Sequence, residues 1–82
     1  MSKLKPLVWH KLMEDDDSYW WADATIGEYY VDKKRDGAVW YLTRGEETVS
    51  QQQSCSSIAH GKQLCEEDYR RRVAALFDTQ QL

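Results

Sequence analysis

Two runs of alternating side chains flank the dipeptide Asp36-Gly37, and this arrangement constrains the fold more than any other feature of the chain. Before the dipeptide, aromatic residues alternate with smaller or polar ones over residues 19–32. After it, residues 38–43 alternate in the same way, so that every second side chain would point to one face of an extended backbone. Asp-Gly between two such runs predicts a β-hairpin. The centre of the chain is therefore expected to form antiparallel sheet.

Three strands are expected in all. The first covers residues 6–13, a mixture of apolar and polar side chains that ends at the acidic run 14–17. This run lacks the alternating ligand spacing of a calcium loop, so it is interpreted as a solvated turn. The second strand covers residues 19–32, with Gly27 as a bulge or bend inside it. The third covers residues 38–43.

A polar segment and a helix complete the chain. Residues 44–57 are rich in Ser, Gln and Glu and are predicted to form a long loop. From Ser57, a suitable helix cap, apolar positions recur every three or four residues and predict an amphipathic helix over residues 58–77. These positions are Ile58, Gly61, Cys65, Tyr69, Val73 and Leu76. Gly61 is expected to let the helix lie close to the sheet, because it has no side chain.

The predicted fold class is α+β: a three-stranded antiparallel meander with one C-terminal amphipathic helix packed on one face. With 82 residues, the chain has material for a single domain, residues 1–82. Eleven Lys and Arg against fourteen Asp and Glu give a net charge of −3, so the overall basic excess of a dedicated duplex-binding protein is missing. No apolar run approaches the roughly 20 residues that span a bilayer, and no signal-peptide core precedes the acidic run. We expect a cytoplasmic protein without a membrane partner.

Alternation divides the large side chains between the two faces of the predicted sheet. The face under the helix takes Leu7 or Trp9, Trp20, Ala22, Tyr29, Val31, Trp40 and Leu42. The other face takes Tyr19, Trp21, Tyr30, Val39 and Tyr41. So much aromatic area on an uncovered face is unusual for a small domain, and Tyr and Trp are enriched at protein interfaces. This face is the expected binding surface for a partner protein or for a second copy of the chain, the plain alternative being a partly solvated face without a partner.

The alternative function is that of a weak binder of single-stranded nucleic acid or RNA. The same aromatic rings are suited to stack on unpaired bases, as they do on other RNA-binding sheets. Such a site also needs a basic rim, and the available basic residues are Lys33, Lys34, Arg35, Arg70 and Arg71. Acidic residues adjoin both of these clusters, which favours the protein partner.

No motif in the chain indicates catalysis. Cys55, His60 and Cys65 are spaced as C-x4-H-x4-C, but zinc sites usually contain a close pair of cysteines, and a helix would turn His60 and Cys65 onto different faces. A thiol on the apolar side of a helix is also a poor nucleophile. The polar segment lacks the glycine motif of a phosphate-binding loop. We therefore expect a non-enzymatic protein with no cofactor and no metal, whose two cysteines are free thiols.

Several short patterns along the chain resemble a group of small uncharacterised phage and prophage proteins. The patterns are Trp20-x-Ala22, Ile26-Gly27-x-Tyr29-x-Val31, Asp36-Gly37 before Trp40-x-Leu42, and a helix that begins Ser57-Ile58 and runs through Lys62, Cys65, Asp68-Tyr69 and Arg72-Val73. The resemblance covers roughly residues 6–77. It implies a bacterial or phage source and an accessory role in the cytoplasm, and it implies no reaction and no site residues. The chain differs from the pattern at Gly61, where a small helix former such as Ala is usual.

Overall fold

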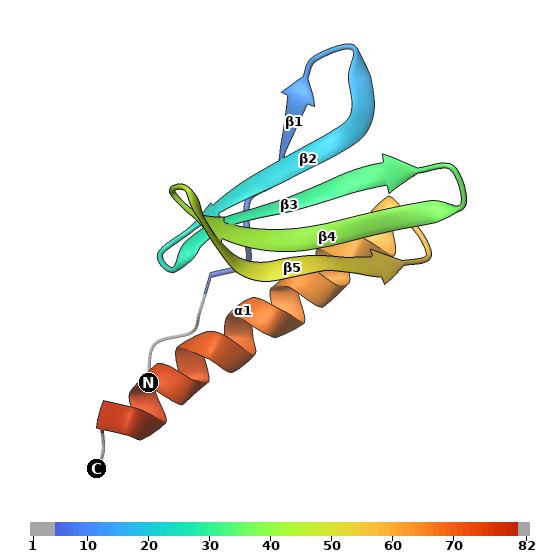
Figure 1. The fold of residues 1–82 in the computed structure, drawn as a ribbon. Helices are drawn as coiled ribbons and strands as arrows, with labels where there is room; N and C mark the ends of the chain where they lie inside the picture. Colours follow the sequence, from blue (N-terminus) through green and yellow to red (C-terminus); the bar gives the residue numbers. More distant parts are fainter. Residues whose placement is uncertain (1–4, 81–82) are drawn as a thin grey trace.

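A five-stranded antiparallel sheet and one long helix make up the protein (Figure 1). The computed structural model describes residues 5–80, with side chains described as far as residue 76. The elements are β1 (His10–Met13), β2 (Asp16–Ala24), β3 (Gly27–Lys34), β4 (Gly37–Arg44), β5 (Glu47–Cys55) and α1 (Ile58–Gln80). The strands lie side by side in chain order, and α1 crosses one face beneath β3, β4 and β5. The α+β class with a C-terminal helix on an antiparallel sheet is confirmed, but the predicted three strands are five.

The single strand predicted over residues 19–32 is wrong, because this segment belongs to a hairpin. β2 and β3 pair antiparallel with Trp21 opposite Tyr30 and Ala24 opposite Gly27, so the chain reverses between them. Gly27 has a positive φ of 145°, and a side chain there would collide with the carbonyl oxygen of Thr43. Gly27 therefore begins a new strand instead of bending an old one.

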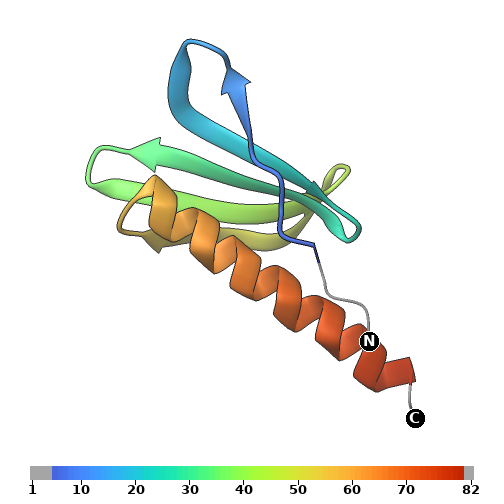
Figure 2. The same cartoon turned by 180° about the vertical axis from the view of Figure 1, so that it is seen from behind.

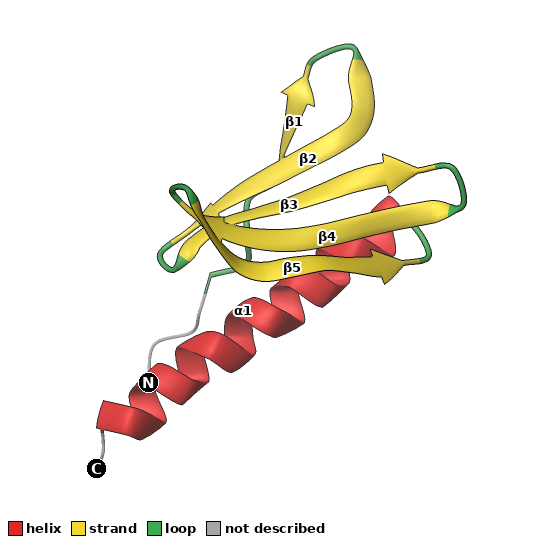
Figure 3. Ribbon diagram, viewed as in Figure 1, coloured by secondary structure: helices red, strands yellow, loops and turns green. Residues whose placement is uncertain are grey.

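The prediction of a loop over residues 44–57 is also wrong. β5 pairs with β4 over most of this segment, with Arg44 opposite Glu47 and Ala38 opposite Cys55 (Figure 3). Gly45, with a φ of 63°, makes the tight turn between the two strands. β5 is an edge strand whose side chains are mostly exposed. Backbone hydrogen bonds to β4 hold it in the sheet, so it shows no hydrophobic alternation.

The N-terminal strand is shorter than the predicted 6–13. Only His10–Met13 forms β1, which pairs with β2. Leu7 is nevertheless buried, because the segment before β1 packs against α1, where the Leu7 amide donates to Glu66 Oε1 at 2.7 Å. The acidic run contributes to both turn and strand, since β2 begins at Asp16.

The helix is longer than the predicted 58–77 and extends past the end of the sheet (Figure 2). The spacing of apolar residues predicts Leu76 on the buried side of the helix, yet its exposed fraction is 53%. The periodicity is correct, but the sheet has ended before the helix reaches this turn. At the other end, the Ser57 hydroxyl accepts a hydrogen bond from the His60 amide at 3.1 Å, which confirms Ser57 as the helix cap.

The core lies between the sheet and α1. It consists of Leu7, Ala22, Tyr29, Val31, Ala38, Trp40, Leu42, Cys65 and Tyr69, with Trp9 and Trp20 half-buried at its margin. This confirms which face of the sheet the helix covers. The predicted reason for Gly61 is confirmed as well, since a Cβ at this position would lie 2.7 Å from Val31 Cγ1 and 3.0 Å from Cys55 Sγ. Of the residues described, no helical segment is both long enough and apolar enough to traverse a membrane.

Candidate functional site

A row of four rings crosses the open face of the sheet, opposite α1. The strand registers align His10 with Trp21, Trp21 with Tyr30, and Tyr30 with Tyr41, so β1 to β4 each contribute one ring. The His10 and Trp21 rings lie 5.0 Å apart between centroids, and the Tyr30 and Tyr41 rings stack at 5.1 Å with an angle of 15° between their planes. We call these four residues the aromatic row. Aromatic cross-strand pairs of this kind stabilise a sheet by about 0.2–1 kcal/mol each.

The rows on either side of the aromatic row carry acidic residues. Alternation places them on the same face of the sheet. One flanking row is Asp23, Glu28, Thr43 and Thr48, and the other is Tyr19, Asp32, Val39 and Ser54. The three rows together contain three carboxylates and no Lys or Arg. The open face is therefore aromatic at its centre and negatively charged at its sides.

The open face brings together all five residues predicted for partner binding. Tyr19, Trp21, Tyr30, Val39 and Tyr41 lie on it, and no element within residues 5–80 covers them (Figures 1 and 2). Tyr19 is 39% exposed, and the other four are half-buried against their neighbours.

His10 is the ring that the sequence prediction missed. It faces Trp21 across the β1–β2 pair. The strand prediction over residues 6–13 included it, but only pairing with β2 assigns His10 to the open face, and the alternation in this segment is too weak to do so.

Asp32 and Tyr41 form a polar contact within this apolar surface. The Tyr41 hydroxyl donates to Asp32 Oδ2 at 3.2 Å. Burial, together with the negative charge of Asp32, raises the pKa of Tyr41 to about 12. The phenol therefore keeps its proton at physiological pH and remains a fixed donor to a nearly buried carboxylate. Aromatic faces beside carboxylates can hold a cation, because the ring faces and the acids attract positive charge together.

The basic residues named for nucleic-acid binding do not come together. Lys33, Lys34 and Arg35 lie at the turn between β3 and β4, and Lys33 pairs with Ala38, a core residue on the helix side. Arg70 and Arg71 lie further along α1, and Arg71 Nη2 is bound to Asp68 Oδ1 at 2.6 Å. Lys33, Arg70 and Arg71 thus lie on the helix side of the sheet, away from the aromatic rings.

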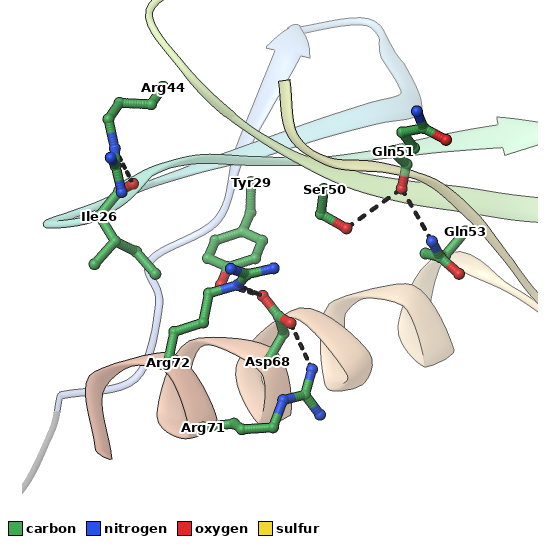
Figure 4. Close-up of polar contacts among 9 residues, drawn as sticks. All are labelled: Ile26, Tyr29, Arg44, Ser50, Gln51, Gln53, Asp68, Arg71 and Arg72. Carbon is green, nitrogen blue, oxygen red and sulfur yellow. Dashed lines mark hydrogen bonds and ion pairs between the residues drawn. The ribbon is translucent and has the colours of Figure 1, made fainter. Parts of the chain in front are cut away.

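A buried acid on α1 connects the helix to the sheet (Figure 4). The Tyr29 hydroxyl and Arg72 Nε both donate to Asp68 Oδ2 at 2.7 Å, and Arg71 donates to the other oxygen. Asp68 is only 2% exposed. Burial alone would raise its pKa, but the hydrogen bonds from Tyr29 and the two arginines outweigh burial and hold the pKa below its usual value. Because Tyr29 adjoins Tyr30 in β3, this contact fixes the strand that carries the centre of the aromatic row.

Neither cysteine is activated as a nucleophile. Cys55 is half-buried, Cys65 is fully buried, and no disulfide joins them. Burial raises the pKa of both thiols, so both are protonated at neutral pH. Within residues 5–80, His, Cys, Asp and Glu side chains form no cluster of three or more that is arranged to hold a metal ion.

Comparison with protein-family models, with curated proteins and with solved structures returned no significant match for this chain. The resemblance to phage and prophage proteins therefore stays a prediction.

Proposed function

We propose that this protein is a non-enzymatic accessory protein of the phage or prophage type, which acts in the cytoplasm by binding a partner protein through the open face of its sheet. The observation that carries the proposal is the aromatic row itself. Four rings from four strands are aligned on a sheet face that no described element covers (Figures 1 and 2). Rigid Tyr and Trp side chains bind partners at a low cost in conformational entropy, which is why they dominate interface hot spots.

The charge of the face favours a basic partner. Asp23, Glu28 and Asp32 flank the rings without any Lys or Arg among them. An Arg or Lys that lies over Trp21 or Tyr30 would gain roughly 0.5–2 kcal/mol from the ring and would also approach these carboxylates. We therefore propose a partner segment that is rich in Arg or Lys.

The same charges disfavour two other binding partners, namely a second copy of the chain and a nucleic acid. In a two-fold symmetric dimer, the open face of one copy would contact the open face of the other, and their acidic residues would repel each other. Nucleic-acid phosphates would meet the same repulsion. The charges on this face thus favour a basic protein segment over both a second copy of the chain and a nucleic acid.

The test is capture of the partner from a nuclease-treated bacterial lysate. The bait variant Trp21→Thr with Tyr30→Thr removes two rings and keeps β-forming residues. We expect the wild-type protein to retain a specific basic protein, and the variant to lose it while its far-ultraviolet circular dichroism is unchanged. Equal capture by the two proteins would contradict the proposal.

Charge variants add a matched control. Asp23→Asn with Glu28→Gln neutralises two acids beside the rings, and Glu46→Gln with Glu47→Gln neutralises two exposed acids at the β4–β5 turn. Only the first pair is expected to weaken capture, by about tenfold for the loss of one to two favourable charge contacts. If both pairs have the same effect, the partner responds to net charge and not to this face.

A further inference from the structure

A pocket of about 550 Å³ lies at the end of the sheet where the β3–β4 turn meets the first turn of α1. Four cations line it, namely Lys33, Lys34, Arg35 and Lys62, together with one acid, Asp17. The local charge is thus positive in a chain whose net charge is −3. Small-molecule sites occupy about 300–1,000 Å³, so the pocket has the size of a ligand site.

None of these four cations forms an ion pair with an acid among the residues whose side chains the structure describes, although Asp17 lines the pocket and the charge of Lys33 acts on Asp16. The ion pairs found among residues 5–80 all involve Asp68, which lies further along α1. Holding several like charges around one concave surface is unfavourable unless an anion screens them. The positive charge of these side chains would therefore stabilise an anion bound in the pocket.

Lys62 is positioned by two tryptophans. Its Nζ lies 3.3 Å from the centroid of the Trp20 ring and 5.9 Å from that of Trp9. Burial, and next the charge of Lys11, lower the pKa of Lys62. A lysine held against ring faces loses less conformational freedom when it binds a ligand than a lysine that extends freely into solvent.

The first turn of α1 borders the same pocket. Ile58 and Ala59 line it from the first turn of α1, where amides have no acceptor within the helix. Such amides, together with the helix dipole, favour a negatively charged group. Lys33, Lys34 and Arg35 come from the β3–β4 hairpin, whereas Lys62 and the first turn belong to α1, so the site exists only in the folded chain.

We propose that this pocket binds the phosphoryl groups of a small ligand that carries two or more phosphates, such as a nucleoside diphosphate or triphosphate. The site has four cations, more than a single phosphate needs. Asp17 in the pocket wall and Asp36 beside it limit the run of positive surface that a nucleic-acid strand would follow. The pocket is separate from the aromatic row, so this proposal stands independently of the protein partner.

The test is a titration of the ¹⁵N-labelled full chain with inorganic pyrophosphate, followed by amide chemical shifts and by calorimetry. We expect saturable binding with a Kd below about 1 mM, with shifts at residues 33–37 and 56–62. The variants Lys62→Gln and Arg35→Gln should each weaken binding about tenfold, as the loss of one charge-assisted contact predicts. Arg35→Gln lies in an exposed turn, so it tests the site even if Lys62→Gln disturbs the packing of Trp20.

Arg70→Gln is the matched control, because Arg70 is an exposed cation outside the pocket. Its affinity should match that of the wild type. No saturable binding of pyrophosphate, or an equal loss in the control, would overturn the proposal. Two further ligands distinguish the source of the phosphates. Tighter binding of ATP than of pyrophosphate supports a nucleotide. Binding of a single-stranded oligonucleotide without binding of pyrophosphate would overturn the proposal of a small ligand.

Discussion

Asp68 shows how one residue connects the stability of the fold to the geometry of its open face. Its carboxylate receives hydrogen bonds from Tyr29, Arg71 and Arg72 while it is almost completely buried. An unpaired charge in this position would be strongly destabilising. The contribution of each hydrogen bond to the free energy of unfolding therefore depends on whether the others are present. The sequence placed Asp68 within a helix but gave no sign that a tyrosine 39 positions earlier would face it.

Asp68→Asn should lower the free energy of unfolding by roughly 1–3 kcal/mol at pH 7, since it removes charged hydrogen bonds within the core. Because the folded-state pKa of Asp68 lies below that of the unfolded chain, about 3.9, its contribution is present above that pH and is lost as pH falls through the folded-state value. The difference between wild type and variant should therefore shrink on acidification. Urea unfolding at a series of pH values measures this, and a difference that stays constant with pH would contradict the assignment.

At the scale of the elements, the contact between α1 and the sheet depends on Gly61. The helix passes so close to β3 and β5 that a Cβ would meet Val31 and Cys55. Alanine would improve the intrinsic helix propensity by about 1 kcal/mol, whereas overpacking costs about 1–3 kcal/mol. The two effects on stability have opposite signs. Because the branched side chain of Val31 has few alternative rotamers, we expect the cost of overpacking to be the larger of the two.

Gly61→Ala is thus expected to lower the melting temperature, whereas Gln63→Ala, at an exposed position on the same helix, should not. A double-mutant cycle identifies the cause. If the clash with Val31 is responsible, Gly61→Ala should cost less in a Val31→Ala background than in the wild type. A stabilised Gly61→Ala protein would show that the helix does not lie this close to the sheet.

Sequence reasoning predicted those elements whose side chains alternate between core and solvent. The helix, its cap at Ser57 and the strand around Trp40 follow from periodicity, as does the division of the aromatic residues between two faces. β5 could not be found in this way, because an edge strand is held by backbone pairing and buries few side chains. The β2–β3 hairpin was missed because Thr25-Ile26 is not a typical turn dipeptide.

For the whole molecule, the main result of folding is a separation of charge that composition does not reveal. The net charge is −3, but the charged residues are not evenly distributed. Acidic residues flank the aromatic row on the open face, and basic residues line a pocket at the margin of the helix side. The predicted nucleic-acid site combined rings from the first surface with Lys33, Lys34 and Arg35, which line the second, and with Arg70 and Arg71, which line neither. The sequence alone does not predict that Lys62 completes the basic pocket, because its contact with Trp20 joins distant parts of the chain.

The central claim is that the open face binds a basic protein segment, and a peptide titration tests it most directly. The ¹⁵N-labelled protein is titrated with a peptide of alternating Arg and Ser, and with a Glu-Ser peptide as the control. We expect the Arg peptide alone to shift the Trp21 indole signal and the Tyr30 and Tyr41 amides, and the shifts to disappear in the Trp21→Thr, Tyr30→Thr variant. Shifts that are absent from β2–β4, or that persist in this variant, would contradict the claim.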